Sequence, residues 1–311
     1  MKVQLLIPVF NDWASLDKLL KDLDAQAATL PGTDFHAMVI NDGSTLAGTP
    51  SGPWPHLRGV EVADLVANFG HQRALACGLG LAAGGEVDQI LLMDGDGEDR
   101  PEDIPSLLAA SGDSHIAVAR RKKRSEGPGF RAGYLLYKWL FLLATGRWIY
   151  FGNFMTIPRT LAEPLSHSPH AGNHLAAAIM RLRLPVQAVD VARGRRFDGK
   201  SQMSYVTLVL HGLSAISVFA EMVLTRTLLF LGALAGASAL GLLTVAAVRS
   251  FTDLAIPGWA TYVSLALLAL IFQAMMGALF LTFLSLALRQ IPAWIPAEHA
   301  RASIRMVRKL K

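Results

Sequence analysis

The stretch Gln89–Pro105, QILLMDGDGEDRPEDIP, decides the fold, because a short apolar run leads directly into six acids within ten positions. A run of this length that ends in an Asp-Gly turn is typical of a buried parallel strand, and open α/β sheets bind ligands beyond the carboxyl ends of such strands. Asp94 and Asp96 are therefore expected at a sheet edge, where two nearby carboxylates can hold Mg²⁺ or Mn²⁺ together with substrate phosphates. The alternative is a solvated acidic loop, because Asp-Gly-Asp-Gly is also good turn chemistry.

The order of residues in this stretch resembles the metal-binding segment of the family 2 glycosyltransferases, which have a GT-A fold. The resemblance rests on Asp94-Gly95-Asp96 after a strand, followed by Glu98, Asp99 and Pro101. Within this family, the sequence most resembles the polyprenyl-phosphate glycosyltransferases, such as dolichol-phosphate mannose synthase and membrane-anchored bacterial relatives. It implies a Rossmann-like α/β domain with a mostly parallel sheet, a nucleotide diphosphate sugar as donor, and Mg²⁺ or Mn²⁺ held by Asp94, Asp96 and Glu98.

Two long uncharged stretches set the C-terminal part of the chain apart. The chain has 311 residues, 52% of them apolar, and no charged residue occurs from 228 to 248 or from 255 to 288. Each stretch is long enough for the roughly 20 residues that cross a bilayer as a helix. Residues 1–9 are too short an apolar run for a secretory signal, and the lone Cys77 excludes an internal disulfide. We therefore expect the N-terminal domain to stay in the cytoplasm.

The distribution of charge favours a membrane over nucleic acid as the partner of this basic chain, whose net charge is +5. Cations gather after the second uncharged stretch, whereas the link between the two stretches has only Arg249 and Asp253. The positive-inside rule then places both termini in the cytoplasm, with the protein in the inner membrane. We expect a catalytic domain over 1–203, an amphipathic juxtamembrane helix over 204–226, a transmembrane hairpin over 227–289 with spans at about 228–248 and 259–288, and a basic cytoplasmic tail over 290–311.

Three loops of the N-terminal half carry the residues expected at the nucleotide sugar. Strands over 3–9 and 37–41 end in the sequences PVFND and NDGS, and the sequence NFGH at 68–71 opens a helix rich in small residues. Taken alone, each loop is ordinary turn or helix-cap chemistry, and His71 is either a donor to phosphate or a packing residue. Following the resemblance, we assign nucleotide-sugar binding to Pro8, Asn11, Asp12, Asp42, Ser44, Asn68, Gly70 and His71.

Two clusters of cations are expected to hold phosphates. A strand over 115–119 leads into five consecutive cations at 120–124. The first of them, Arg120, matches a phosphate-binding arginine of the family, and Arg131, seven residues after the run, matches another. A strand over 187–191 leads into a loop that resembles the family's Arg-x-x-Gly-x-Ser-Lys loop, with Gln202 in place of the final Lys. A solvated or lipid-attracted basic face is the alternative for both clusters. The expected acceptor-phosphate residues are Arg193, Arg196, Lys200 and Ser201, and the expected catalytic set is Asp94, Asp96, Arg120, Arg131 and Arg196.

The segment after these motifs bears on the acceptor. Residues 133–145 are apolar and aromatic but too short to cross a bilayer, which favours a position in the membrane interface. No carboxylate occurs from Ile149 to Asn153, where the family commonly has an Asp. A hydroxyl acceptor needs a general base, whereas a phosphate acceptor is already ionised near neutral pH, so this absence favours a phosphate.

These features predict an inverting, membrane-anchored glycosyltransferase that moves a sugar from a nucleotide diphosphate sugar to a polyprenyl phosphate such as undecaprenyl phosphate, for cell-envelope glycoconjugates. The alternatives are a glycosyltransferase with a hydroxyl acceptor, a processive polysaccharide synthase, and a catalytically inactive scaffold. Only two spans and Ala144 in place of an acceptor-site Gln argue against the synthase. Gly232 and Gly236 form a Gly-x-x-x-Gly patch in the first span, which predicts helix association and a homo-oligomer.

Overall fold

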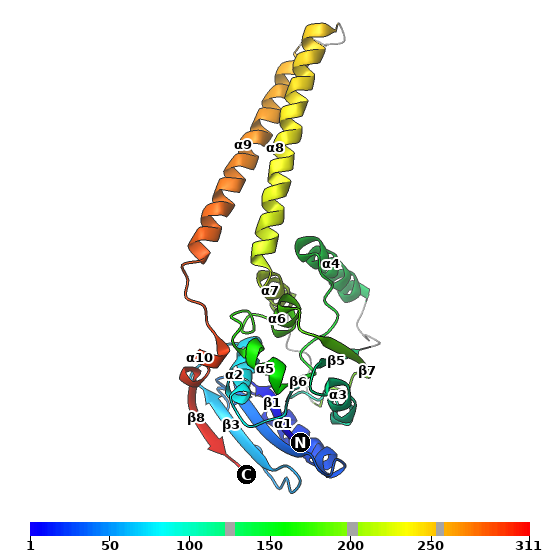
Figure 1. The fold of residues 1–311 in the computed structure, drawn as a ribbon, viewed down its shortest axis with the longest axis vertical. Coiled ribbons are helices and arrows are strands. Elements are labelled where there is room, and N and C mark those ends of the chain that lie inside the picture. Colours follow the sequence, from blue (N-terminus) through cyan, green and yellow to red (C-terminus); the bar gives the residue numbers. More distant parts are fainter. Residues whose placement is uncertain (122–127, 198–204, 253–257) are drawn as a thin grey trace. The chain divides into compact units, whose positions relative to one another are not determined.

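The computed structural model describes residues 1–121, 128–197, 205–252 and 258–311, which form two compact units (Figure 1). Unit 1 comprises residues 1–142, 147–218 and 293–311, and unit 2 comprises residues 143–146 and 219–292. Most of unit 2 is therefore inserted in the sequence of unit 1, between residues 218 and 293.

One mixed sheet of eight strands forms the centre of unit 1, as far as the structure describes it, in the order β7-β5-β6-β4-β1-β2-β3-β8. β1 pairs in parallel with β2 and β4, β2 with β3, and β5 with β7, whereas β6 and β8 run antiparallel to their neighbours. The predicted α/β class with a mostly parallel sheet is confirmed. The strands are β1 (Lys2–Val9), β2 (Asp34–Asn41), β3 (Gly59–Leu65), β4 (Gln89–Leu92), β5 (Ile116–Arg121), β6 (Met155–Pro158), β7 (Val186–Val191) and β8 (Ile304–Lys309).

The sheet has an apolar core on each face, because successive side chains of a strand point to opposite sides. Leu5 and Ile7 of β1 belong to the same buried cluster as Leu20 of α1. On the other face, Gly78 of α2 lies against the sheet, where a Cβ would come within 3.1 Å of Ile40. The helices of unit 1 are α1 (Trp13–Ala28), α2 (His71–Ala83), α3 (Ile104–Ser111), most of α4 (Pro128–Thr145), α5 (Arg159–Ser166), α6 (Leu175–Leu182), α7 (Tyr205–Ser217) and α10 (Pro296–His299), with 3₁₀ turns at Pro101–Asp103 and Arg301–Ser303.

The C-terminal segment differs from the basic tail that the sequence predicts over 290–311. α10 packs on α2, and β8 pairs antiparallel with β3 from Glu61↔Lys309 to Leu65↔Ile304. The backbone groups at the edge of β3 need hydrogen-bond partners, and β8 supplies them. Gly80 permits the approach of α10, because a Cβ there would collide with the main chain of Pro296. The C-terminal segment is therefore part of the central sheet of unit 1.

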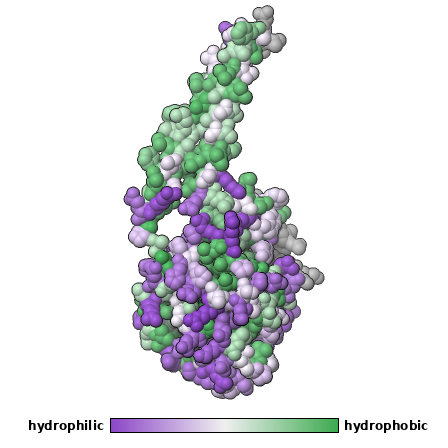
Figure 2. All heavy atoms as spheres, viewed as in Figure 1, coloured by the Kyte–Doolittle hydropathy of each residue, from purple (hydrophilic) through white to green (hydrophobic). Residues whose placement is uncertain are grey.

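Unit 2 is built on α8 (Ala220–Phe251) and α9 (Trp259–Leu288), which are long and apolar enough to cross a membrane. Most of their side chains are exposed, and Figure 2 shows apolar residues over their surface, whereas a core helix of a soluble protein buries its apolar face. The predicted spans lie within α8 and along α9. The helix predicted over 204–226 is interrupted, since α7 ends at Ser217 and α8 begins at Ala220.

Small residues divide between two roles in these helices. Gly241 and Gly277 lie at the contact between α8 and α9, where added Cβ atoms would come within 3.1 Å of Leu267 and 3.4 Å of Leu231. Gly232 and Gly236 have no atom within 4 Å of their Cβ positions among the described residues. The Gly-x-x-x-Gly patch is thus not used between α8 and α9, and its role in an oligomer stays a prediction.

The apolar segment predicted for the membrane interface is the C-terminal part of α4. Trp139, Leu140 and Leu143 are all more than half exposed, and the Trp139 ring packs edge-on against Trp148 with 6.2 Å between centroids. Large exposed apolar side chains on a helix fit a membrane interface, and that placement stays a prediction.

Candidate active site

The acidic loop that follows β4 lies at the carboxyl edge of the parallel strands. β4 pairs with β1, so that Gly95 lies beside the main chain of Pro8, where a Cβ would be 3.4 Å from Pro8 O. The loop is held by its own carboxylates: Asp99 Oδ2 accepts from Asp94 N at 2.9 Å, and Asp96 Oδ1 accepts from Glu98 N at 2.9 Å. The predicted metal-binding residues therefore share one loop with fixed backbone geometry.

Three arginines from two segments face these carboxylates. Arg196 Nη2 lies 2.6 Å from Asp96 Oδ2 and 3.5 Å from Glu98 Oε1. Arg193 Nη2 donates to both oxygens of Glu98, at 2.9 and 2.8 Å. Arg121 Nη2 donates to Asp99 Oδ1 at 2.7 Å, and its Nη1 reaches Glu98 at 3.3 Å. In this conformation the cations of the predicted phosphate loop neutralise the predicted metal site.

Backbone contacts also hold the arginine loop on the acidic loop. Gly194 N donates to Glu98 O and Phe197 N donates to Asp96 O, each at 2.9 Å. Gly194 has no room for a side chain, because a Cβ there would collide with Gly97 O. Gly97 itself has φ +85°, a conformation that L side chains rarely adopt. The glycines thus let two loops, almost a hundred residues apart in sequence, lie directly on each other.

Asp94 offers the oxygen best suited to a cation. Its Oδ1 is buried and has no hydrogen bond of regular geometry, and the nearest partner is His71 Nε2 at 3.3 Å. A buried carboxylate oxygen whose contact with His71 is this long, and which lies next to Asp96, fits a divalent ion. Among the described residues no three His, Cys, Asp or Glu side chains form a complete metal site. Asp94 and Asp96 suit Mg²⁺ or Mn²⁺, which proteins usually hold by one or two carboxylates plus substrate phosphates.

The charges around Asp94 shift the pKa values of its neighbours in opposite directions. Burial raises the pKa of Asp94, but His71, Arg121 and Arg196 outweigh burial and hold the value below its usual range. Burial would lower the pKa of His71, yet the surrounding carboxylates, Asp94 first, raise it. Burial and the Asp94 charge raise the pKa of Asp99 to about 7, against the opposing effect of Arg121. The carboxylates around His71 therefore favour its charged form, with Asp94 as the largest contributor.

The nucleotide loops are tied together by side-chain to backbone hydrogen bonds. Asp42 is 3% exposed and accepts from Phe69 N at 2.7 Å and from Gly70 N at 2.9 Å, so it holds the loop that opens α2. Asn68 Oδ1 also accepts from Gly70 N. Burial raises the pKa of Asp42 despite these bonds. Each Asp42 oxygen keeps a second lone pair, so the predicted contact with the nucleotide sugar is compatible with this role.

The loops after β1 and β2 interlock in the same way. Asn11 has φ +58°, and its Oδ1 accepts from Thr45 N and Leu46 N, each at 2.9 Å. Ser44 Oγ accepts from Asn11 N at 2.9 Å. Asp12 caps α1 by accepting from Ser15 N at 3.3 Å. The structure thus brings together the predicted residues of the first two nucleotide loops.

A search against family models adds the observation that decides the family. The model of glycosyl transferase family 2 matches residues 5–175, more than half of the chain, and spans the nucleotide loops and the acidic loop. The chain belongs to glycosyl transferase family 2. The GT-A class predicted from the resemblance is the class of this family, and the eight-stranded sheet followed by two apolar helices agrees with it.

Curated relatives cover only part of the chain. An undecaprenyl-phosphate 4-deoxy-4-formamido-L-arabinose transferase of Erwinia tasmaniensis is 29% identical over 136 residues, which are 42% of this chain and 40% of the relative. A dodecaprenyl-phosphate galacturonate synthase of Rhizobium johnstonii is 27% identical over 147 residues, 44% of this chain and 42% of the relative. The matches span about two fifths of these relatives. A solved glucosyl-3-phosphoglycerate synthase of Mycobacterium tuberculosis shares 17% identity with a TM-score of 0.47, covering 72% of this chain and 79% of its own.

The β5 cation that reaches the acidic loop of this glycosyltransferase is Arg121, the neighbour of the predicted Arg120. Arg120 Nε pairs with Asp190 Oδ1 at 2.7 Å, across the β5–β7 register, and both side chains are partly exposed. Consecutive strand residues point to opposite faces, which explains why only one of the two arginines meets the acids. Arg131 lies in α4, but the structure does not describe its side chain. Lys200 and Ser201 lie outside the described residues. These three assignments stay predictions.

Polar residues that the motifs did not mark surround His71. Asn153 Nδ2 lies 3.0 Å from His71 Nε2, and Gln72 Nε2 donates to Asn153 Oδ1 at 3.2 Å. Behind them, the buried His174 packs against His211 with 4.6 Å between ring centroids. Burial lowers the pKa of His174 to about 3, so this ring is neutral. None of these residues has a recognisable sequence motif, and only the fold brings them to Asp94.

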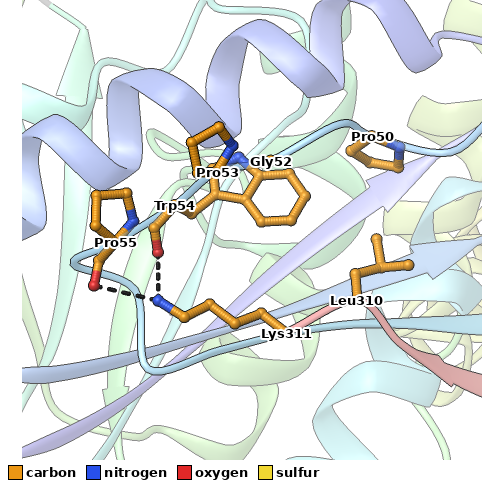
Figure 3. Close-up of a pocket in the computed structure, with 7 residues that line it drawn as sticks. All are labelled: Pro50, Gly52, Pro53, Trp54, Pro55, Leu310 and Lys311. Carbon is orange, nitrogen blue, oxygen red and sulfur yellow. Dashed lines mark hydrogen bonds between the residues drawn. The ribbon is translucent and has the colours of Figure 1, made fainter.

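A surface pocket lies apart from the candidate site. Figure 3 shows Lys311 reaching across it, with Nζ donating to Trp54 O and Pro55 O. None of the predicted site residues lines it. Its lining consists of Pro50, Gly52, Pro53, Trp54, Pro55, Leu310 and Lys311.

Proposed function

We propose that this glycosyltransferase transfers a sugar, with inversion, from a nucleotide diphosphate sugar to a polyprenyl phosphate at a membrane surface. The carrying observation is the acidic loop of Asp94 and Asp96, which meets three arginines at the carboxyl edge of the sheet. Carboxylates suit a metal-bound diphosphate, and guanidinium groups suit phosphates. A site that holds both kinds of group fits a reaction with phosphate on both substrates.

The donor side requires a divalent cation. Asp94 and Asp96 would hold Mg²⁺ or Mn²⁺ together with the donor phosphates, and the bound ion would offset the charge that develops on the leaving diphosphate. Arg196 and Arg193 now pair with Asp96 and Glu98, so they must exchange these carboxylates for phosphate oxygens when the donor binds. The predicted role of Glu98 as a third ligand depends on the same exchange.

The acceptor side supports a phosphate over a hydroxyl group. A phosphate monoester is largely dianionic at neutral pH and needs orientation but no general base. Asp99 cannot serve as a base for a bound hydroxyl, because it is 2% exposed and its oxygens are engaged by Arg121 and by Asp94 N. The relatives named as undecaprenyl- and dodecaprenyl-phosphate enzymes further support a polyprenyl phosphate.

The chain path supports an anchor that crosses the membrane twice. Unit 1 contains residues from both sides of the α8–α9 pair, since β8 completes its sheet. If α8 and α9 both span the bilayer, the segments before and after them lie on the same side. The cations after α9 support a cytoplasmic location for that side, with unit 1 at the inner membrane.

The test is a transfer assay with the purified protein and Mn²⁺. A panel of radiolabelled nucleotide sugars is offered with undecaprenyl phosphate, or with soluble sugars as hydroxyl acceptors. Asp96→Asn is the matched inactive control. We expect a labelled product only in the lipid phase and only with undecaprenyl phosphate. Transfer to a soluble sugar would favour a glycosyltransferase with a hydroxyl acceptor. A protein that neither binds nor turns over any nucleotide sugar of the panel would favour an inactive scaffold.

A further inference from the structure

Arg308, on the strand that follows the hairpin, begins a series of contacts toward the nucleotide loops. Its Nε donates to Asp64 Oδ2 at 2.7 Å, and its Nη2 donates to Asp64 Oδ1 at 3.1 Å. Asp64 ends the parallel part of β3, and its side chain is only 4% exposed. A two-point pair between planar groups fixes the orientation of both, so Arg308 determines how the buried carboxylate lies.

The next contact fixes the amide of Asn41, at the end of β2. Asn41 Nδ2 donates to Asp64 Oδ1 at 2.7 Å, and Asn41 Oδ1 accepts from Ser44 N at 3.0 Å. An ionised carboxylate can only accept hydrogen bonds, so the NH₂ group of Asn41 must face Asp64. The amide oxygen is then directed at the loop, where it receives the Ser44 backbone.

The series ends at residues assigned to the nucleotide sugar. Ser44 Oγ accepts from Asn11 N at 2.9 Å, and Asn11 Oδ1 holds the backbone of Thr45 and Leu46. Arg308 adds a direct contact at the far end of the same loop, from Nη1 to Thr49 Oγ1 at 3.1 Å. Both ends of the segment 44–49 thus depend on one guanidinium group.

We propose that Arg308 is a positioning residue of the donor site: through Asp64 and Asn41 it holds the Ser44 loop in the conformation that binds a nucleoside diphosphate. The inference rests on the proposed donor site at Asn11 and Ser44. It gives β8 a role in binding as well as in folding, because the donor loop is complete only when the chain has returned from the hairpin.

Loss of Arg308 has a defined consequence. Burial raises the pKa of Asp64, but bonds from Arg308 and Asn41, with the charge of Arg305, hold it below its usual range. Without Arg308 the pKa of this buried carboxyl rises, and its protonated form can donate to Asn41 Oδ1. The amide then turns over, and Ser44 N loses its acceptor.

The experiment uses the full chain in detergent with Mn²⁺ and a panel of UDP, GDP, CDP and dTDP. The dissociation constant of the tightest-binding nucleotide should rise about tenfold in Arg308→Met, as expected for one lost loop contact. In turnover assays the KM for the donor should rise while that for the lipid acceptor stays unchanged. Arg308→Lys should restore binding only in part, because an ammonium group cannot make the two-point pair. Lys309→Met is the matched control, since Lys309 is 80% exposed and lies 3.7 Å from Glu61, and it should bind as the wild type does.

A second variant separates positioning from folding. Arg308→Met leaves a buried carboxylate without its cation and loses stability, whereas the double variant Asp64→Asn with Arg308→Met buries no charge. The double variant should unfold near the wild-type temperature yet still bind the nucleotide about tenfold more weakly, because a neutral amide at position 64 can donate as well as accept and does not fix the Asn41 amide. Wild-type affinity in the double variant would overturn this proposal alone. A wild-type protein that binds no nucleotide of the panel would overturn the proposed function, and this proposal with it.

Discussion

Replacing Arg121 with Met should make the protein lose stability, relative to the wild type, as the pH rises above 7. Arg121 donates to Asp99, whose side chain is 1% exposed and whose pKa lies at about 7. Arg121 is a main group that lowers this pKa, against burial and the charge of Asp94. Without it the folded state keeps Asp99 protonated to higher pH, whereas the unfolded state releases that proton near pH 4.

The sign and size of the effect follow from proton linkage. Between about pH 4 and 7, folded wild type and folded variant both hold the Asp99 proton, so their free energies of unfolding fall in parallel. Above pH 7 the wild type has released the proton and the variant has not. The free energy of unfolding of the variant should then fall below that of the wild type by a further ~1.4 kcal/mol per pH unit, or about 2 kcal/mol by pH 8.5.

Urea unfolding of the purified protein in detergent and EDTA, at pH values from 5.5 to 8.5, measures this difference. Arg120→Met is the matched control, since Arg120 is the adjacent residue on β5 and pairs with Asp190 at a partly exposed site. The difference between control and wild type should not change with pH. Parallel curves for Arg121→Met and wild type from pH 7 to 8.5 would refute the reasoning, as would an equal slope in the control.

Three further predictions concern the metal, the topology and the hairpin. Asp96→Asn should abolish Mn²⁺-dependent nucleotide binding in titration calorimetry while the unfolding temperature changes little, because an amide ligates the ion poorly; retained Mn²⁺-dependent binding would move the ion elsewhere. Cys77 is buried with its pKa raised to about 11, so it gives a silent background for maleimide labelling. A membrane-impermeant maleimide should label Ser250→Cys in intact cells and Ala302→Cys only after permeabilisation, and the opposite pattern would invert the topology. Gly232→Leu should leave the fold intact, since the position is open, and unchanged cross-linking between copies would exclude the patch from an oligomer contact.

Local sequence chemistry is sufficient to predict the acidic loop and its strand. The apolar run before Asp94 has the composition of a buried parallel strand, and the loop that follows is held by hydrogen bonds between residues at most five positions apart. The cap of α1 at Asp12 is equally local. Features of this kind depend on neighbours in sequence, so they can be read without the fold.

The choice between Arg120 and Arg121 shows where sequence reasoning stops. Alternation along β5 requires the two side chains to point to opposite faces, but the run of cations gives no register. The pairing of Arg120 with Asp190 on β7 decides the register, and that partner is 70 residues away.

The C-terminal strand was missed for a related reason. Ile304–Lys309 carries three cations in six residues, a composition that is typical of a juxtamembrane tail as much as of an edge strand. Its partner β3 precedes it by more than two hundred residues, and the two apolar helices lie between them. The pairs of Arg308 with the buried Asp64 and of Lys309 with Glu61 explain the basic character of this strand.

The charges of the site set the conditions under which a donor can enter. Four carboxylates of the acidic loop lie beside three guanidinium groups and His71, so much of their negative charge already has a cationic group next to it. A diphosphate alone would compete with Asp96 and Glu98 for Arg193 and Arg196, and would leave those carboxylates without partners. A diphosphate that enters with a divalent cation replaces the arginines at the carboxylates while the arginines move to phosphate, and every charge keeps an opposite neighbour. Under the proposed function, the arginines that pair with these carboxylates would therefore make donor binding depend on the metal.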